Sequence, residues 1–465
     1  MMKESVKNTM QQIEYIATTT DCWTAHRQSF LGVTAHWLDP ESLQRQSAAL
    51  ACRRLKGSHT HDLLASSLDE IHTEYSIRGK IVRTTTDNAS NFVKAFRVFA
   101  SENENAVDSE EDDEDPEEDT EAVDVEALLE EEDDSFQYQL PKHHRCTCHL
   151  INLIATVDAK KAETNIGYRN ICRSAFAKCF GLWNKSARSA TAAEIIEKEC
   201  KLQLIHPVET RWNSYFLAVE RVLRIVRESG EGAIRAVTIA LKVPMFSPAE
   251  LEFLAEYAAV MSPVSNALNI LQGEAIHMGW LVPTITILTE KLNRLQASSK
   301  FCQPLVVTLQ DGIQRRFSDM LADPELIAAS ILLPKFRSSW TRNEDLLKLG
   351  MDYIKTHMES YTATSTPNLS GSDEVDDFCF SMGNASETTH QLDVYMASSV
   401  TSMDILKSVP ALLKLSLKLN TPLPASAACE RLFSTAGHIF SAKRGRLSSK
   451  NFENQLLLKL NKTHW

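Results

Sequence analysis

The stretch "KIVRTTTDNASNFVKAF" (residues 80–96) predicts a strand and the start of a helix, with an aspartate between them. The β-branched residues from Ile81 to Thr86 favour a strand, and Asp87 ends it. An aspartate in this position is commonly a turn or helix-cap residue, and that alternative stays open for Asp87 taken alone. The stretch gains weight because the chain contains the same pattern a second time.

The other copy lies nearer the N-terminus, where "EYIATTTDCWT" (residues 14–24) predicts a strand that leads to Asp21. If the two strands are neighbours, both carboxylates emerge at the same edge of the sheet. Carboxylates that converge are costly unless a divalent cation neutralises them, and a pair of Mg²⁺ ions held in this way supports phosphodiester chemistry.

A third carboxylate is needed to complete such a site. We expect it to be Glu430, which lies early in the helical stretch "PASAACERLFSTAGHIF" (residues 424–440). Its small neighbours allow a close approach between helix and sheet. The alternative is a surface glutamate paired with an arginine of its own helix.

The rest of the chain changes character near residue 150. Before that point the patterns predict a helix with Thr60 as its N-cap, and further strands over residues 29–39, 46–57 and 142–148. Helical patterns dominate from about residue 150 to 415. Residues 362–377 are polar, contain Pro and Gly, and predict a surface loop.

The composition bounds the class of protein. The chain of 465 residues is too long for one ordinary core, and its ten cysteines lack a disulfide spacing, which indicates a reducing compartment. No stretch suits a membrane span or a secretory signal. Of the 61 acidic residues, 20 lie in the run 102–134, which predicts a solvated loop. The remaining chain, with 49 basic and 41 acidic residues, carries about +8, which is compatible with a nucleic-acid partner.

Several stretches occur in an order that resembles a known superfamily. The two aspartate-containing stretches and "SFLGVTAHWLD" are followed by "RCTCHLINLI", "ETRWNSYFLAVERVL", "LADPELIAASILLPKF" and "PASAACERLFSTAGHIFSAKRGRLSSKNFENQLLLKLN". Together they resemble the hAT transposases, and more closely the BED-type zinc-finger proteins derived from them. The last stretch is similar to the C-terminal dimerisation region of that family. The resemblance covers nearly the whole chain from about residue 15.

The resemblance implies an α/β fold in which an RNase H-like core is interrupted by a large all-α insertion. It also implies a metal triad of Asp21, Asp87 and Glu430, which uses Mg²⁺ if it is active. The expected parts are a disordered start, the first part of the core, an acidic disordered loop, the last core strand, the helical insertion, and the C-terminal core helices with the dimerisation region. Their bounds are 1–11, 12–101, 102–135, 136–149, 150–415 and 416–465.

DNA contacts are implied at two places. The resemblance puts His149 near bound DNA and likens Arg211 and Trp212 to the element that stabilises a flipped base. An indole face can stack on an unpaired base, and a guanidinium can hold a phosphate. The alternative is a buried tryptophan with a structural arginine.

A basic turn, "AKRGRL" (residues 442–447), predicts a phosphate contact or a nuclear import signal, with a solvated turn as the alternative. Its cationic residues are Lys443, Arg444 and Arg446.

Self-association is predicted at the C-terminus, because "NFENQLLLKLN" (residues 451–461) has more apolar surface on one face than a short terminal helix normally buries alone. The predicted dimer contacts are Leu432, Phe433, Phe452, Leu456, Leu457 and Leu460. The alternative is packing within the chain, against the insertion.

Zinc is not expected, because Cys146 and His149 form C-x-x-H without a second pair at suitable spacing. The residues before Asp21 are too few for a BED-type finger. We therefore expect a domesticated hAT transposase-like nuclear protein that dimerises and binds DNA, with no membrane or small-molecule partner and without demonstrated catalysis. The alternatives are an active metal-dependent D-D-E transposase or nuclease, and a truncated transposon relic without a role.

Overall fold

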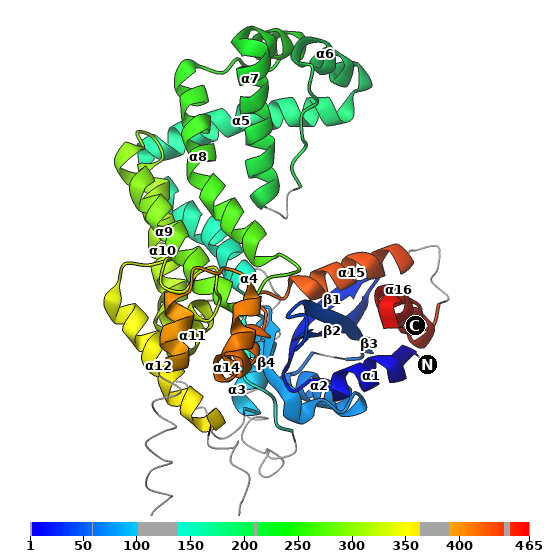
Figure 1. Ribbon diagram of the computed structural model, residues 1–465. Helices are drawn as coiled ribbons and strands as arrows, with labels where there is room; N and C mark the ends of the chain where they lie inside the picture. The colour runs from blue at the N-terminus through cyan, green and yellow to red at the C-terminus, as the bar shows by residue number, and fades with distance from the viewer. Residues whose placement is uncertain are drawn as a thin grey trace, which may run out of the picture. The chain divides into compact units, whose positions relative to one another are not determined.

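The computed structural model describes residues 2–57, 59–100, 138–208, 212–362, 390–440 and 447–464. The chain divides into two compact units (Figure 1). Unit 1 comprises Met1–Cys146 and Ser416–Trp465, and unit 2 comprises Thr147–Leu415. The predicted bounds of the helical insertion, residues 150 and 415, lie at or beside the ends of unit 2. The predicted acidic loop and all but the first residue of the predicted loop 362–377 lie outside the described residues.

Unit 1 contains a mixed sheet. Its strands are β1 (Ile16–Ala25), β2 (Gln28–Leu38), β3 (Arg45–Leu55), β4 (Ile81–Thr86) and β5 (His143–Arg145), in the order β3-β2-β1-β4-β5. β1 pairs antiparallel with β2 and parallel with β4, β2 pairs antiparallel with β3, and β4 pairs parallel with β5. The strands that lead to Asp21 and Asp87 are therefore neighbours, and the chain is mixed α/β as predicted.

Threonine hydroxyl groups connect the central strands. Thr18 Oγ1 lies 2.7 Å from Thr84 Oγ1 across the β1–β4 pair, and Thr19 Oγ1 lies 2.7 Å from Thr34 Oγ1 across the β1–β2 pair. All four residues are buried, where polar groups are stable only when they are hydrogen-bonded. The threonine runs thus supply both the strand preference of β-branched residues and the bonds between strands.

Helices from both ends of the chain cover this sheet. They are α1 (Met2–Gln11), α2 (His61–Glu74), α3 (Ser90–Val98), α15 (Ala427–Ile439) and α16 (Ser449–Leu460). Figure 1 shows α15 lying along β1 and β2, and contacts join α15 to both strands. Thr60 caps α2 as predicted, since its hydroxyl accepts a hydrogen bond from the Leu63 N–H at 3.3 Å.

The predicted disordered start (residues 1–11) is wrong, because residues 2–11 form α1. Met2, Val6 and Met10 recur every four residues and are buried in the core of unit 1. This spacing places them on one face of a helix, which explains why the segment is ordered.

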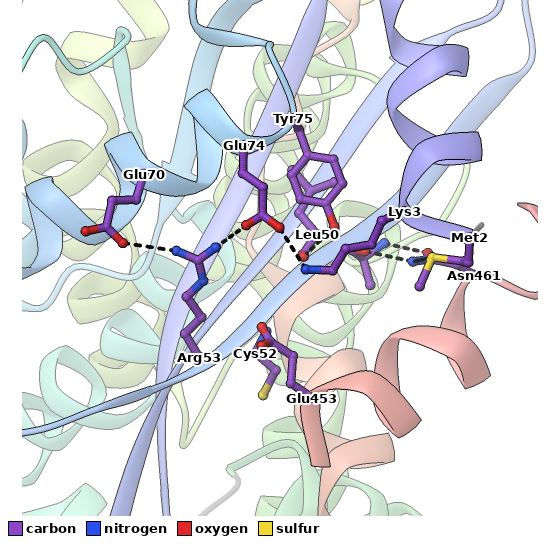
Figure 2. Close-up of polar contacts among 11 residues, drawn as sticks. Met2, Lys3, Leu50, Cys52, Arg53, Glu70, Glu74, Tyr75, Glu453 and Asn461 are labelled. Carbon is purple, nitrogen blue, oxygen red and sulfur yellow. Dashed lines mark hydrogen bonds and ion pairs between the residues drawn. The ribbon is translucent and has the colours of Figure 1, made fainter. Parts of the chain in front are cut away.

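β3 is one of the two edge strands of the described sheet, and side chains satisfy several of its outer backbone groups (Figure 2). Asn461 donates from Nδ2 to the Ala49 carbonyl and accepts at Oδ1 from the Ala49 N–H, both at 2.8 Å. Glu453 accepts from the Cys52 N–H at 3.0 Å. An open edge can pair with another chain, so these bonds close the edge with the C-terminal segment.

Charged and polar contacts bind α1 and α2 to the same edge (Figure 2). The Tyr75 hydroxyl donates to the Leu50 carbonyl at 2.8 Å. Glu74 pairs with Arg53 of β3 and with Lys3 of α1, the latter at 2.8 Å. The α2 and C-terminal segments therefore contact the sheet edge directly, and α1 is connected to it through Glu74.

Unit 2 is helical within the described residues. Its main helices are α4 (Thr147–Leu153), α5 (Ile166–Arg188), α6 (Ala190–Cys200), α7 (Trp212–Ala240), α8 (Pro248–Leu271), α9 (Leu281–Ser298), α10 (Gln303–Ala322), α11 (Pro324–Ile331) and α12 (Glu344–Thr362). α14 (Pro410–Asn420) crosses the boundary between the units. Across the described part of the chain, no helix combines the length and apolarity that a membrane crossing requires.

Two buried carboxylates, Glu250 and Asp158, form hydrogen bonds and ion pairs between elements of unit 2. Glu250 at the start of α8 accepts from Lys178 Nζ at 2.5 Å and from Ser174 Oγ at 2.5 Å. Burial opposes ionisation of Glu250, but these hydrogen bonds outweigh it and hold its pKa at about 2. Asp158 is fully buried and pairs with Arg315 and Arg316 of α10.

Candidate acidic site

Asp21 lies within β1, and Asp87 directly follows β4 at the corresponding position. Thr20 of β1 is the register partner of Thr86 of β4, and each of these threonines is followed by one of the two aspartates. Because the strands are parallel, both acids lie at the same end of the stretch over which β1 and β4 pair, as predicted. The prediction that a strand ends at Asp21 is wrong, since β1 continues to Ala25; only Asp87 directly follows the end of its strand.

Helix α15 places Glu430 on the same side of the sheet as Asp21. Phe433 of this helix stacks on Trp23, with ring centroids 5.7 Å apart. Asp21 and Trp23 are alternate residues of β1 and therefore share one face of the sheet. The Glu430 side chain is exposed.

Burial and neighbouring charges disfavour ionisation of Asp21. Burial is the largest cause and the negative charge of Asp87 the next, and together they raise the pKa of Asp21 to about 8. Cys146 and Glu430 raise this pKa by smaller amounts, whereas the Cys22 N–H, which donates to Asp21 Oδ1 at 2.7 Å, lowers it. Asp87 thus acts on Asp21 more strongly than Glu430 does.

The donor set fits a divalent cation by its chemistry, because Mg²⁺ prefers oxygen ligands and would offset the repulsion between Asp21 and Asp87. Among the described residues, however, no three His, Cys, Asp or Glu side chains are arranged as a formed metal site. Asp87 Oδ1 accepts from the Ala89 N–H at 3.3 Å, which is the turn contact of the alternative interpretation. The structure brings two acids together and carries Glu430 on the adjacent helix, and metal binding by the three stays a prediction.

Trp212 lies at the start of α7 and is 8% exposed. Its Nε1 donates to Asn152 Oδ1 at 2.7 Å. The indole lines a cavity of about 420 Å³ in unit 2, together with four further aromatic side chains: Tyr168, Phe176, Tyr215 and Tyr257. Trp212 is thus a mostly buried side chain that still borders open space.

The other predicted DNA contacts are placed only in part. His149 lies in α4 of unit 2 and is half-buried. Arg211 and the basic-turn residues Lys443, Arg444 and Arg446 lie outside the described residues.

The residues predicted as dimer contacts lie in the core of unit 1. Leu460 is half-buried and packs against that core. The other five side chains are buried in it: Leu432, Phe433, Phe452, Leu456 and Leu457. They cover the sheet of their own chain, and a dimer contact through these residues stays a prediction. Packing within the chain, the alternative interpretation, accounts for them, although the partner is the sheet rather than the insertion.

Histidine and cysteine near the end of β5 have structural contacts. His143 stacks on Phe96 at 4.7 Å and lies 2.9 Å from Thr86 Oγ1. Cys146 Sγ accepts from the Ser426 N–H at 3.3 Å, which connects the end of the first core segment to the start of α15.

Sequence reasoning missed the residues that bind the segment 421–423, which precedes α15, to the sheet. Thr85 Oγ1 donates to the Leu423 carbonyl at 2.7 Å, and Arg45 donates to the Thr421 carbonyl at 2.7 Å. Gly32 was also missed, although a glycine inside a strand commonly marks a close approach of another element.

Residues 19–109, which include Asp21 and Asp87, match the ZBED1 RNase-like domain family. Zinc finger BED domain-containing protein 4 of Homo sapiens is 21% identical over 68% of this chain and 29% of its own length. A Zea mays protein named as an AC transposase is 25% identical over 48% of this chain and 24% of its own length. The resemblance to hAT transposases and BED-type proteins is confirmed.

A Talaromyces stipitatus protein named as the transcriptional regulator tpeD is 22% identical over 98% of this chain. The chain spans 55% of the length of that protein and a smaller share of the other two. The similarity covers most of this chain for the Talaromyces stipitatus and Homo sapiens proteins and about half of it for the Zea mays protein, and it covers only part of each relative.

Proposed function

We propose that this protein is a transposase-derived nuclear protein that binds DNA and that unit 1 is an RNase H-like core. The observation that carries the proposal is the pair of acids at the end of the stretch over which the parallel strands β1 and β4 pair, inside the segment that matches an RNase-like domain. The strand order β3-β2-β1-β4-β5 supports the fold assignment. The names of the relatives, a transcriptional regulator, a BED zinc-finger protein and a transposase, support DNA as partner and the nucleus as location.

The cavity beside Trp212 supports a contact with unpaired DNA. Its volume of about 420 Å³ lies in the range of small-ligand sites, and five aromatic side chains line it. Aromatic faces stack on bases whatever their identity, so this site would hold an unstacked base while cationic side chains hold the backbone.

Fluorescence anisotropy with a labelled hairpin and a matched plain duplex tests both parts. Binding of both is expected at low salt and is expected to weaken strongly between about 50 and 200 mM salt, as phosphate contacts require. Trp212→Ala should weaken hairpin binding by about fivefold or more and leave duplex binding unchanged, because a stacked base contributes about 1–3 kcal/mol. Leu217→Ala, at an exposed position of the same helix, is the matched control. Absence of binding at low salt would overturn the DNA proposal, and equal losses for hairpin and duplex would overturn the base contact.

A metal-dependent nuclease or transposase is the second candidate, favoured by the raised pKa of Asp21 beside Asp87. When bound, Mg²⁺ or Mn²⁺ would activate water at the phosphodiester. Supercoiled plasmid incubated with either cation should be nicked by the wild type and not by Asp87→Asn, whereas Asp62→Asn, at an exposed position of α2, should retain nicking. Nicking that survives in Asp87→Asn would exclude this site as its source.

A further inference from the structure

Helix α15 comes unusually close to β2 at Gly32, the register partner of Asp21. A Cβ atom on Gly32 would lie 2.6 Å from Cζ and 2.8 Å from Cε1 of Phe433, distances that real Cβ atoms essentially never show. The missing side chain at Gly32 therefore lets the Phe433 ring lie directly against the strand. The same ring stacks on Trp23, so the helix is held on both β1 and β2.

Cys429 holds α15 one turn earlier. Its Sγ lies 3.2 Å from the Thr19 carbonyl oxygen and 3.6 Å from the Gly32 carbonyl oxygen. The side chain is completely buried. Cys429 and Phe433 are four residues apart and so belong to the same face of the helix.

Glu430 lies between these two contacts, directly after Cys429 and one turn before Phe433. A helix held at both positions can neither rotate about its axis nor move along the sheet at Glu430. The Glu430 backbone is therefore fixed, while its exposed side chain has room to change rotamer.

We propose that Gly32, Cys429 and Phe433 are positioning residues that set the distance between α15 and β1 at which Glu430 reaches the Asp21–Asp87 pair. This proposal rests on the proposed divalent-cation site. Among the described residues the three acids are not arranged as a formed metal site, so the proposal requires the Glu430 side chain to change rotamer on its fixed backbone.

Amide hydrogen exchange over residues 427–439 tests the contact without metal. Gly32→Ala should push the Phe433 ring outward and speed exchange across α15 by about tenfold or more. Adding Phe433→Leu, which removes the ring, should bring the rate back toward that of the Phe433→Leu single variant. Gly437→Ala is the matched control, because the nearest atom to its added Cβ is 3.9 Å away. Unchanged exchange in Gly32→Ala would overturn the proposal.

Mn²⁺ binding followed by electron paramagnetic resonance tests the positioning role. Gly32→Ala should weaken Mn²⁺ binding by about tenfold in the wild-type background, as outer contacts of metal ligands typically do. In a Glu430→Gln background the same substitution should have no further effect, because it acts through Glu430. An equal loss in both backgrounds would show a general structural role and overturn the positioning role. A wild type that binds no Mn²⁺ would instead defeat the cation site and the role given to Glu430, while the exchange experiment still decides whether α15 is held as described.

Discussion

At the scale of single residues, burial controls ionisation in unit 1. Burial is the first cause that raises the pKa of Asp21 to about 8 and that lowers the pKa of His72 and of His143 to about 3. In each case the low-polarity surroundings favour the neutral form. The stability of unit 1 should therefore depend on pH in two overlapping windows, in which the two contributions change in opposite directions.

The first window belongs to Asp21. The folded chain keeps a proton on this group up to about pH 8, whereas the unfolded chain releases it near pH 3.8, so wild-type stability falls as pH rises between these values. Asp21→Asn removes this pH dependence. The free energy of unfolding of the variant should therefore rise relative to that of the wild type by about 1.4 kcal/mol per pH unit across the window. Urea unfolding at several pH values, without divalent cations, measures this gain. A difference that does not change with pH would contradict it.

The second window belongs to the buried histidines. Burial and then the charge of Arg78 keep His72 neutral in the fold down to about pH 3, whereas the unfolded chain takes up a proton near pH 6.5. The contribution of the neutral His72 to the stability of unit 1 is fully present above pH 6.5 and is lost as the pH falls toward 3. His72→Phe should reduce this loss by about 1.4 kcal/mol per pH unit. The substitution breaks no hydrogen bond at Nε2, because this atom has no partner among the described residues. Urea midpoints between pH 7 and 4 measure the slope, and identical slopes in variant and wild type would refute the assignment.

At the scale of elements, the closed edge of β3 depends on one side chain. Asn461→Ala leaves both the N–H and the carbonyl of Ala49 without their partner in a buried place, and each orphaned group costs about 1–3 kcal/mol. We expect unit 1 to lose about 3 kcal/mol, measured as a lower urea midpoint. Asn454→Ala, at an exposed position of α16, should change it little. Equal effects of the two substitutions would show that the edge bonds contribute nothing.

Local patterns predicted the elements that local chemistry determines. The strands before Asp21 and Asp87 and the Thr60 cap follow from β-branched runs and capping preference, which a short window of sequence contains. The burial of Phe452 and Leu456 could not be predicted in this way, because an apolar helix face looks the same whether it covers its own sheet or a partner.

The candidate site shows the same limit. The contact between Gly32 and Phe433 joins residues from opposite ends of the sequence, and no property of either neighbourhood specifies it. The two aspartates and the place of Asp87 after a strand were predictable, whereas the continuation of β1 past Asp21 to Ala25 was not. The distance of Glu430 from the other acids depends on how α15 lies on the sheet, which only the structure describes.

At the scale of the whole molecule, each of the two units has its own buried charges. Lys178→Met leaves Glu250 buried without its main cation, which typically costs about 3–5 kcal/mol. Because Glu250 keeps its charge down to about pH 2 in the fold, the loss should be full at neutral pH. Amide hydrogen exchange should show faster exchange in α5 and α8 and unchanged exchange in β1 and β4. Equal acceleration in both units would contradict this separation.

The two parts of unit 1 leave the ribosome far apart in time. The whole of Thr147–Leu415 is synthesised after the strands and before α15 and α16, which takes roughly 10–50 seconds at ordinary elongation rates. During that interval the Ala49 backbone and the surface around Gly32 lack the segments that later cover them. Chaperone capture of nascent chains should therefore concentrate on the early strands and end only when Asn461 has emerged.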